Sequence, residues 1–300
     1  MDTIEQFFTF MNERHAIYLR RLRGDMWPWT YDEILQTYKF TNVYRELDAG
    51  TKWCKDNIRE PYYDHVELFF NIATYRRYNW VYTARELGFI EKYDPEYYTD
   101  RMLKRQARGE KIFTGSHMIC GSIRNKDGSI SKNKVIQLFK ISFSELWEKR
   151  RAIEPRPGDT LEQAFNRCMD ANIPGFGPFV WYEVITDLRW TRHLIYAEDT
   201  MSWANPGPGA KRGVQRLLGF NVYKPTAEDR AKYPKGDLAY IKVMQSLLST
   251  SPAYLDEWMD QLEMRDIEHT LCEWDKYERA RLGQGAPRSK FTPPHKRKQV

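Results

Sequence analysis

Residues 161–190 read LEQAFNRCMDANIPGFGPFVWYEVITDLRW, and this stretch decides the fold. A helix is predicted up to about residue 171, followed by the turn IPGFG (173–177) and a second helix from Pro178. Glycines permit a tight turn and let backbone amides approach an anion, because no Cβ stands in the way. The second helix would point its free N–H groups at a phosphate. The pattern predicts a helix–hairpin–helix, and a purely structural connection between helices is the alternative.

The rest of the chain also predicts a mainly α-helical protein. Three Ser/Thr-x-x-Glu/Gln capping boxes, at 30–33, 142–145 and 160–163, mark helix starts. Apolar residues at helical spacing occur in several places, for example over 66–73 and 255–262. Residues 112–141 depart from this pattern, because a turn signal at 126–129 separates two runs that could be short strands. A small β-hairpin or an irregular insertion is expected there.

Composition narrows the classes of function. The chain has 300 residues, of which 41% are hydrophobic and 29% charged, so it can form a core and is not a disordered chain. No apolar run is long enough for a membrane helix. The four cysteines are scattered without a Cys-x-x-Cys pair, and the six histidines form no His-x-x-x-His pair. These patterns argue against a zinc or iron–sulfur site, and a reducing cytosol is the expected location.

The charge is unevenly distributed. The net charge is +6, and residues 279–300 hold seven Lys or Arg and no acidic residue. Residues 284–300 are therefore expected to be a basic, flexible tail, either simply solvated or in contact with nucleic acid. Residues 1–283 are expected to form one catalytic domain.

The hairpin resembles that of the helix–hairpin–helix DNA glycosylase superfamily, in which the turn clamps one DNA strand. The resemblance makes Ile173, Gly175, Phe176 and Gly177 the expected DNA-binding residues. In that superfamily a catalytic Asp follows the hairpin by roughly twenty residues, and here Asp199 follows Gly177 at that spacing. The expected fold is glycosylase-like, with two helical lobes and a cleft between them. The chain departs from the superfamily through the insertion WANPGPGA (203–210) and the lack of the hairpin-region lysine of the bifunctional glycosylases.

A second resemblance covers nearly the whole chain. The blocks are RHAIYLRRLRGDMWPWTYDEILQTYKFTNVYRELDAGTKW (14–53), NIATYRRYN (71–79), IFTGSHMICG (112–121), IPGFGPFVWYEVITDL (173–188), NPGPGAKRG (205–213) and LCEWDKYERARLGQG (271–285). In this order they are similar to the α-glutamyl/putrescinyl thymine pyrophosphorylase family, mostly encoded by bacteriophages. The resemblance implies a transferase that replaces pyrophosphate on pyrophosphorylated 5-hydroxymethyluracil in DNA with an amine. A glycosylase-like fold would flip this base out of the duplex.

This chemistry selects candidate residues. The leaving pyrophosphate needs cations or amide donors where charge develops. The candidates are Lys39, Asn42, Arg45, Asn205, Gly207, Gly209, Lys211 and Arg212. Residues 39–45 are expected to be helical, with Asn42 and Arg45 on one face, and an Arg45–Asp48 ion pair within a structural network is the alternative reading. The attacking amine must lose a proton, so a carboxylate is needed. Asp199 is the first choice, and Asp32 and Asp48 are alternates. Asp187 is expected to anchor the hairpin helix instead.

The expected partners follow from the same reaction. They are double-stranded DNA with a modified thymine, an amino acid or polyamine, and an upstream hydroxymethyluracil DNA kinase, because the chain has no nucleotide-binding loop. No metal site is expected. A monovalent cation at the hairpin backbone and magnesium accompanying pyrophosphate stay open as cofactors. The resemblance implies the cytoplasm of a phage-infected bacterium. A DNA N-glycosylase and a non-catalytic DNA-binding module are the competing functions.

Overall fold

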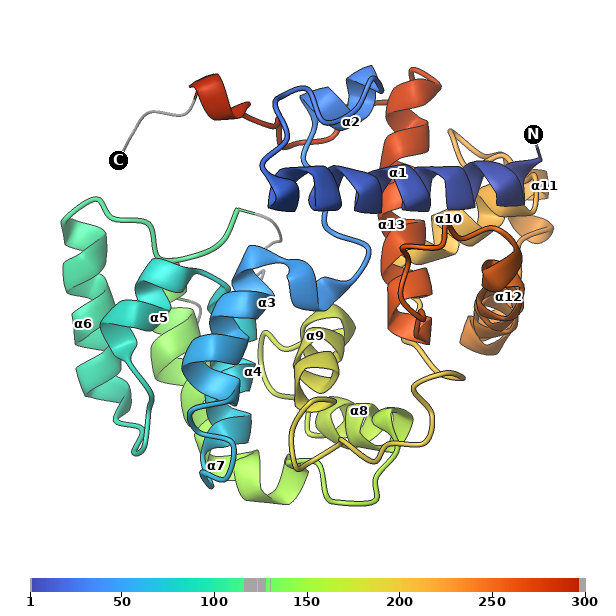
Figure 1. Ribbon diagram of the computed structural model, residues 1–300. Coiled ribbons are helices and arrows are strands. Elements are labelled where there is room, and N and C mark those ends of the chain that lie inside the picture. Colours follow the sequence, from blue (N-terminus) through green and yellow to red (C-terminus); the bar gives the residue numbers. More distant parts are fainter. Residues whose placement is uncertain (1, 116–122, 124–127, 130, 297–300) are drawn as a thin grey trace. The chain divides into compact units, whose positions relative to one another are not determined.

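The computed structural model describes residues 2–115, 123, 128–129 and 131–296. In these residues helices are the only regular elements besides one isolated antiparallel bridge between Tyr38 and Lys290 (Figure 1). The prediction of a mainly α-helical protein is therefore confirmed. The glycosylase-like arrangement stays a prediction, since helix content alone does not distinguish one all-α fold from another.

The chain divides into two compact units. The terminal unit comprises residues 1–48 and 200–300, and the central unit comprises residues 49–199. The helices of the terminal unit are α1 (Thr3–Arg23), α2 (Glu33–Thr37), η1 (Arg45–Leu47), α10 (Pro208–Leu217), α11 (Ala227–Ala231), α12 (Gly236–Thr250), η4 (Ser251–Ala253), α13 (Met264–Arg281) and η5 (Pro294–Lys296).

Helix α13 is the centre of the terminal unit, and α1, α2, α10 and α12 all contact it. Helix α10 packs closely against α13 because glycines, which have no Cβ, lie at the contact. A Cβ at Gly213 would come within 2.5 Å of the carbonyl oxygen of Leu271, and one at Gly209 would collide with Cys272. Helix α1 also packs on α13, where the rings of Phe7 and Trp274 lie edge to face at 5.7 Å. The small residues of GPGAKRG (207–213) therefore set the separation of two helices.

The central unit holds the hairpin. Its helices are α3 (Ala49–Cys54), the π-helical η2 (Lys55–Arg59), α4 (Leu68–Tyr78), α5 (Val81–Leu87), α6 (Pro95–Ala107), the π-helical η3 (Ile136–Ser142), α7 (Phe143–Ile153), α8 (Leu161–Asp170) and α9 (Pro178–Leu188). Helix α4 is buried along its whole length and packs against α7 and α9. Of the three expected capping boxes, the one at Thr160 and Gln163 is present.

The expected hairpin near 112–141 is wrong in its second strand, because residues 134–142 are helical. Asn133 starts this helix: its side chain accepts a hydrogen bond from Val135 N at 2.8 Å. Val135, Leu138 and Phe139 are buried at helical spacing, so packing overrides the strand pattern. Residues 126–127 of the expected turn at 126–129 lie outside the described residues.

Part of the expected flexible tail has a defined position. Lys39 N donates to Ser289 O at 2.9 Å, and Phe291 N donates to Thr37 O at 2.8 Å. The ring of Phe291 stacks on Trp27 at 5.4 Å. Residues 289–291 thus pair with residues 37–39, which the basic composition of the tail did not indicate.

Candidate functional site

The hairpin is held in place by its apolar residues and presents its glycines. Ile173 and Phe176 are buried, and the Phe176 ring packs on Trp181 at 4.6 Å. Gly175 has φ +81°, and a Cβ there would come within 2.8 Å of Ile123 Cδ1. A Cβ at Gly177 would have no neighbour within 4 Å, and Gly177 is the N-cap residue of α9, where it makes no side-chain capping hydrogen bond. Backbone amides at such a helix start suit a phosphate.

A buried ion pair fixes the other end of α9. Both carboxylate oxygens of Asp187 accept hydrogen bonds from the guanidinium of Arg76 on α4, at 2.6 Å for Oδ1. Arg59 lies 3.9 Å away, and Thr51 accepts a further hydrogen bond from Arg76. The expectation that Asp187 anchors the hairpin helix is confirmed.

Asp199, the first-choice catalytic carboxylate, lies at the start of α8. Its Oδ1 accepts a hydrogen bond from Leu161 N at 2.7 Å, and its Oδ2 accepts one from Glu162 N at 3.0 Å. A carboxylate at a helix N-terminus stabilises the helix. Both oxygens therefore have a structural task, and a catalytic role for Asp199 stays a prediction.

Asp32 has a similar structural task in the terminal unit. Its Oδ1 accepts hydrogen bonds from Ile34 N and Leu35 N and so caps α2. The predicted cap at Thr30 is therefore wrong by two residues. Its Oδ2 accepts a hydrogen bond from the Tyr277 hydroxyl at 2.6 Å. Burial and the hydrogen bond to Asp32 raise the pKa of Tyr277.

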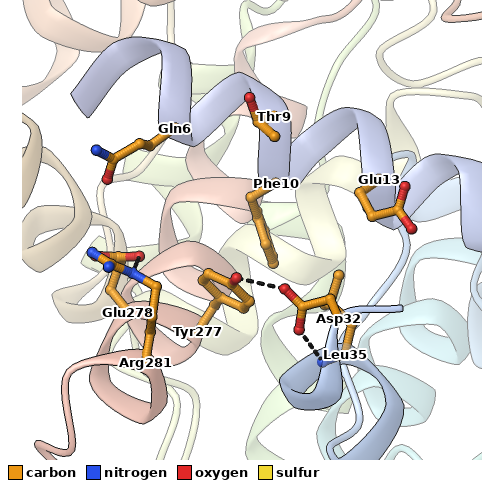
Figure 2. A pocket seen from close by; sticks show the side chains of 9 residues that line it. All are labelled: Gln6, Thr9, Phe10, Glu13, Asp32, Leu35, Tyr277, Glu278 and Arg281. Atoms are coloured by element: carbon orange, nitrogen blue, oxygen red, sulfur yellow. Dashed lines mark hydrogen bonds and ion pairs between the residues drawn. The ribbon is translucent and has the colours of Figure 1, made fainter. Parts of the chain in front are cut away.

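Asp32 also lines a pocket of about 320 Å³ beside α1. Figure 2 shows the pocket, in which Glu278 is paired with Arg281. The nine lining residues are Gln6, Thr9, Phe10, Glu13, Asp32, Leu35, Tyr277, Glu278 and Arg281. Because its charged side chains largely engage one another or the backbone, the pocket offers an aromatic wall and few free charges.

The segment 39–48 forms a polar cluster without being the expected helix. It is an extended loop followed by the single turn η1. Asp48 accepts hydrogen bonds from Asn42 N and Nδ2 and pairs with Arg45 at 2.7 Å. Asn42 Oδ1 in turn accepts a hydrogen bond from Arg14 of α1 at 2.7 Å. Local bonding by Asn and Asp side chains competes with helix formation here. The alternative reading, a structural network with an Arg45–Asp48 ion pair, is present.

The same loop reaches a polar face of α13 that the sequence analysis missed. Thr41 N donates to Glu273 Oε2 at 3.0 Å, and the Thr41 hydroxyl contacts His269 Nε2. Lys276 Nζ donates to Glu273 Oε2 at 2.5 Å and to the carbonyl oxygen of Lys39 at 3.0 Å. The Lys39 side chain itself is exposed. The signal available in the sequence was His269 and Glu273 at i and i+4 of one helix.

His269 is uncharged at neutral pH. Burial lowers its pKa well below 6.5, and the positive charges of Arg45, Arg265, Lys276 and Arg14 lower it further. A neutral imidazole can accept a proton.

The second predicted set, at 205–212, contacts the neighbouring surface of α13. Gly207 N donates to Glu268 Oε1 at 3.1 Å, so this amide is already engaged, and Gly209 packs on Cys272. Lys211 pairs with Asp237, and Asn205 is half-buried. Helix packing thus accounts for the two glycines, and their role in cradling pyrophosphate stays a prediction.

Arg212 completes this set, and its Nε donates to Asp275 Oδ2 at 2.8 Å. Two segments more than 150 residues apart in sequence therefore contact α13. The loop 39–48 contacts it at His269 and Glu273, and the segment 205–212 contacts it at Glu268, Cys272 and Asp275.

Among the described residues, no group of three or more His, Cys, Asp or Glu side chains is arranged to hold a metal ion. In the same residues, no helix is both long and apolar enough to cross a membrane.

Comparisons with known proteins place these features in a family. No solved structure matches the chain. A protein of Bacillus phage SP10 named 5-hmdU DNA kinase is 26% identical over an alignment of 300 residues, which covers 91% of this chain and 44% of the phage protein. The chain thus spans less than half the length of this relative. The family described as "5-hmdU DNA kinase, helical domain" matches residues 1–286, and the chain belongs to that family.

Proposed function

We propose that the protein acts in the hypermodification of thymine in DNA, on a base derived from 5-hydroxymethyluracil. The family membership carries this proposal, because the family description names 5-hmdU in DNA. Gly177 at the start of α9, where a Cβ would have no neighbour within 4 Å, supports a role in binding the DNA backbone. The phage relative, named for the same nucleoside, suggests that the host cell is a bacterium infected by a phage.

Within this pathway, the reaction we propose is the transfer of an amine to the base. The amine nitrogen attacks the exocyclic methylene carbon, the carbon–oxygen bond breaks, and pyrophosphate leaves with the electron pair. The nitrogen then loses a proton to an acceptor. His269 is one candidate, because its neutral imidazole lies on the face of α13 that the loop 39–48 reaches through Thr41. The positive charges around it lower its pKa and so weaken it as a base. Asp48, paired with Arg45, and Asp199 and Asp32, which cap helices, are the competing acceptors.

A second candidate function is the DNA-recognition part of a hydroxymethyluracil kinase. The family description favours it, since the matched part is called the helical domain of a kinase. Transfer of a phosphoryl group from a nucleotide usually needs a glycine-rich phosphate loop. Neither G-x-x-x-x-G-K-S/T nor G-x-G-x-x-G occurs in the 300 residues. On this view the chain binds the modified DNA, and a nucleotide-binding partner supplies the phosphoryl group.

One experiment separates the two candidates. The protein is incubated with duplex DNA that carries pyrophosphorylated 5-hydroxymethyluracil and a panel of amino acids and polyamines, and the digested nucleosides are analysed by mass spectrometry. An aminated nucleoside together with released pyrophosphate is the expected result. Unchanged nucleosides, with preferential binding to 5-hydroxymethyluracil DNA, would contradict amine transfer and favour the recognition part. A parallel reaction with ATP and 5-hydroxymethyluracil DNA tests for a kinase.

Two variants link this activity to residues. His269→Gln keeps a polar side chain but removes the proton acceptor, so turnover should fall about 10²-fold while DNA binding is retained. Asp199→Asn should keep most of its turnover and lose about 1 kcal/mol of stability, because an amide replaces one of the two acceptors at the start of α8. The opposite pattern, with Asp199→Asn inactive and His269→Gln active, would return the proton-acceptor role to Asp199.

A further inference from the structure

Three arginines surround one buried carboxylate between α10 and α13. The side chain of Asp275 is 1% exposed, and it accepts hydrogen bonds from Arg212 Nε and Arg216 Nε, each at 2.8 Å. Arg279 Nε lies 3.6 Å from Oδ2. One negative charge thus faces three positive charges, and the cluster has a local excess of positive charge.

The three arginines differ in their exposure. Arg216 is 8% exposed, and its Nη2 donates a hydrogen bond to Gln284 Oε1, so this side chain is buried and fully engaged within the protein. Arg212 is 41% exposed and Arg279 is 38% exposed. Within the part of the chain that the structure describes, the terminal nitrogens of Arg212 and Arg279 make no hydrogen bond, while Arg279 Nε is buried beside Asp275. Both guanidinium groups therefore keep terminal donors that no other group of the described residues uses.

The packing beneath these arginines fixes the helices that carry them. Gly213 brings α10 against the backbone of α13 near Leu271, one turn before Asp275. Asp275 then holds Arg212 from α10 and attracts Arg279 from its own helix. A flexible arginine loses rotamer entropy when it binds a ligand, and a positioned one loses less.

We propose that Arg212 and Arg279 form a binding site for the phosphodiester backbone of DNA, positioned by Asp275. Guanidinium groups donate in a fork geometry that matches phosphate oxygens. The site is an open surface with both arginines more than a third exposed, which suits a long polyanion better than a small anion that must be enclosed. The proposal rests on the proposed function only for the identity of DNA as the ligand.

The test measures binding to an unmodified duplex as a function of salt concentration. Arg212→Gln and Arg279→Gln should each weaken binding about fivefold to tenfold and reduce the slope of log K against log salt by about 0.9, the value for one lost phosphate contact. Arg281→Gln is the matched control, because Arg281 lies on the same helix, is 44% exposed and already pairs with both oxygens of Glu278. It should leave the slope unchanged. Thermal unfolding verifies that the variants fold.

Two results would overturn the proposal. An unchanged slope in both folded variants would show that these arginines do not contact the backbone. If the variants kept their DNA affinity but lost binding of inorganic pyrophosphate in calorimetry, the anion would be the leaving group and not DNA. Because an unmodified duplex is used, failure of the amine-transfer assay leaves this test unaffected, and the two proposals can fail separately.

Discussion

The two units each contain a buried aspartate held by arginine, and they use it differently. In the central unit, Asp187 is fully buried and Arg76 and Arg59 are each 4% exposed. In the terminal unit, Asp275 is as deeply buried, but Arg212 is 41% exposed and Arg279 is 38% exposed. The first arrangement balances charge inside a core, and the second positions positive charge toward solvent. The exposure of the arginine, more than the presence of the pair, distinguishes a structural ion pair from a candidate binding site.

The largest expected effect comes from breaking the buried pair. Arg76→Gln should lower the free energy of unfolding by about 3–5 kcal/mol, because it leaves Asp187 charged and without its main partner in the core. Urea denaturation measures the loss. A loss below about 1 kcal/mol would mean that solvent or Arg59 compensates the carboxylate, and the contrast between the units would disappear.

A third buried aspartate, Asp266, sharpens the comparison, because it forms no ion pair with an arginine among the described residues. Burial raises the pKa of Asp266 from 3.8 to about 7, although the charge of Arg265 acts in the opposite direction. Between these values the folded state holds a proton that the unfolded chain releases, so the free energy of unfolding should fall as pH rises from about 4 to about 7. The slope approaches about 1.4 kcal/mol per pH unit.

Asp266→Asn isolates this contribution from the histidines, whose lowered pKa values act in the opposite direction near pH 6. Denaturation curves of both proteins are recorded across that range. The difference in stability between them should vary with pH and become constant above about 7. A difference that is the same at every pH would contradict the raised pKa.

A smaller effect is expected from the glycines at the α10–α13 contact. Gly213→Ala should cost about 1–3 kcal/mol, because its Cβ would meet the backbone oxygen of Leu271. Gly177→Ala in the central unit is the control, since a Cβ there has no neighbour within 4 Å. Thermal unfolding of both variants provides the comparison, and equal stabilities would show that α10 and α13 can move apart at little cost.

The smallest expected effect on stability is that of Arg212→Gln. A half-exposed ion pair contributes about 0–1 kcal/mol, and Arg216 still neutralises Asp275. The variant should therefore unfold within about 1 kcal/mol of the parent in urea while its DNA affinity falls. A loss as large as that of Arg76→Gln would class the Asp275 cluster with the structural pairs.

The sequence predicted the helical class and the hairpin because both depend on local signals. Apolar spacing and the capping box at Thr160 act within one or two turns. The role of Asp187 was also predictable, since a carboxylate on the apolar helix α9 needs a partner. The possible second strand of the expected hairpin within 112–141 was wrong, because the packing that makes residues 134–142 helical comes from distant side chains.

The sequence predicted the segments of the candidate site but not the helix face that they contact, because that face also depends on tertiary packing. Lys39, Asn42, Arg45 and the 205–212 segment were selected by residue type, and the structure places both segments against α13. The face that receives them, with His269 and Glu273, resembles an ordinary amphipathic helix in the sequence. The tertiary contacts of the loop, through Thr41 and the carbonyl oxygen of Lys39, distinguish this face, and no local pattern encodes them.

The division of the chain has a consequence for the order of synthesis. The central unit is continuous, whereas the terminal unit combines the first 48 residues with residues after 199. Thr3 Oγ1 donates to the carbonyl oxygen of Leu217, and Phe7 packs on Trp274. During translation the apolar face of α1 therefore stays exposed until α10 and α13 emerge from the ribosome. The central unit can fold first, and a chain interrupted before residue 264 would carry a native hairpin and an unfinished terminal unit.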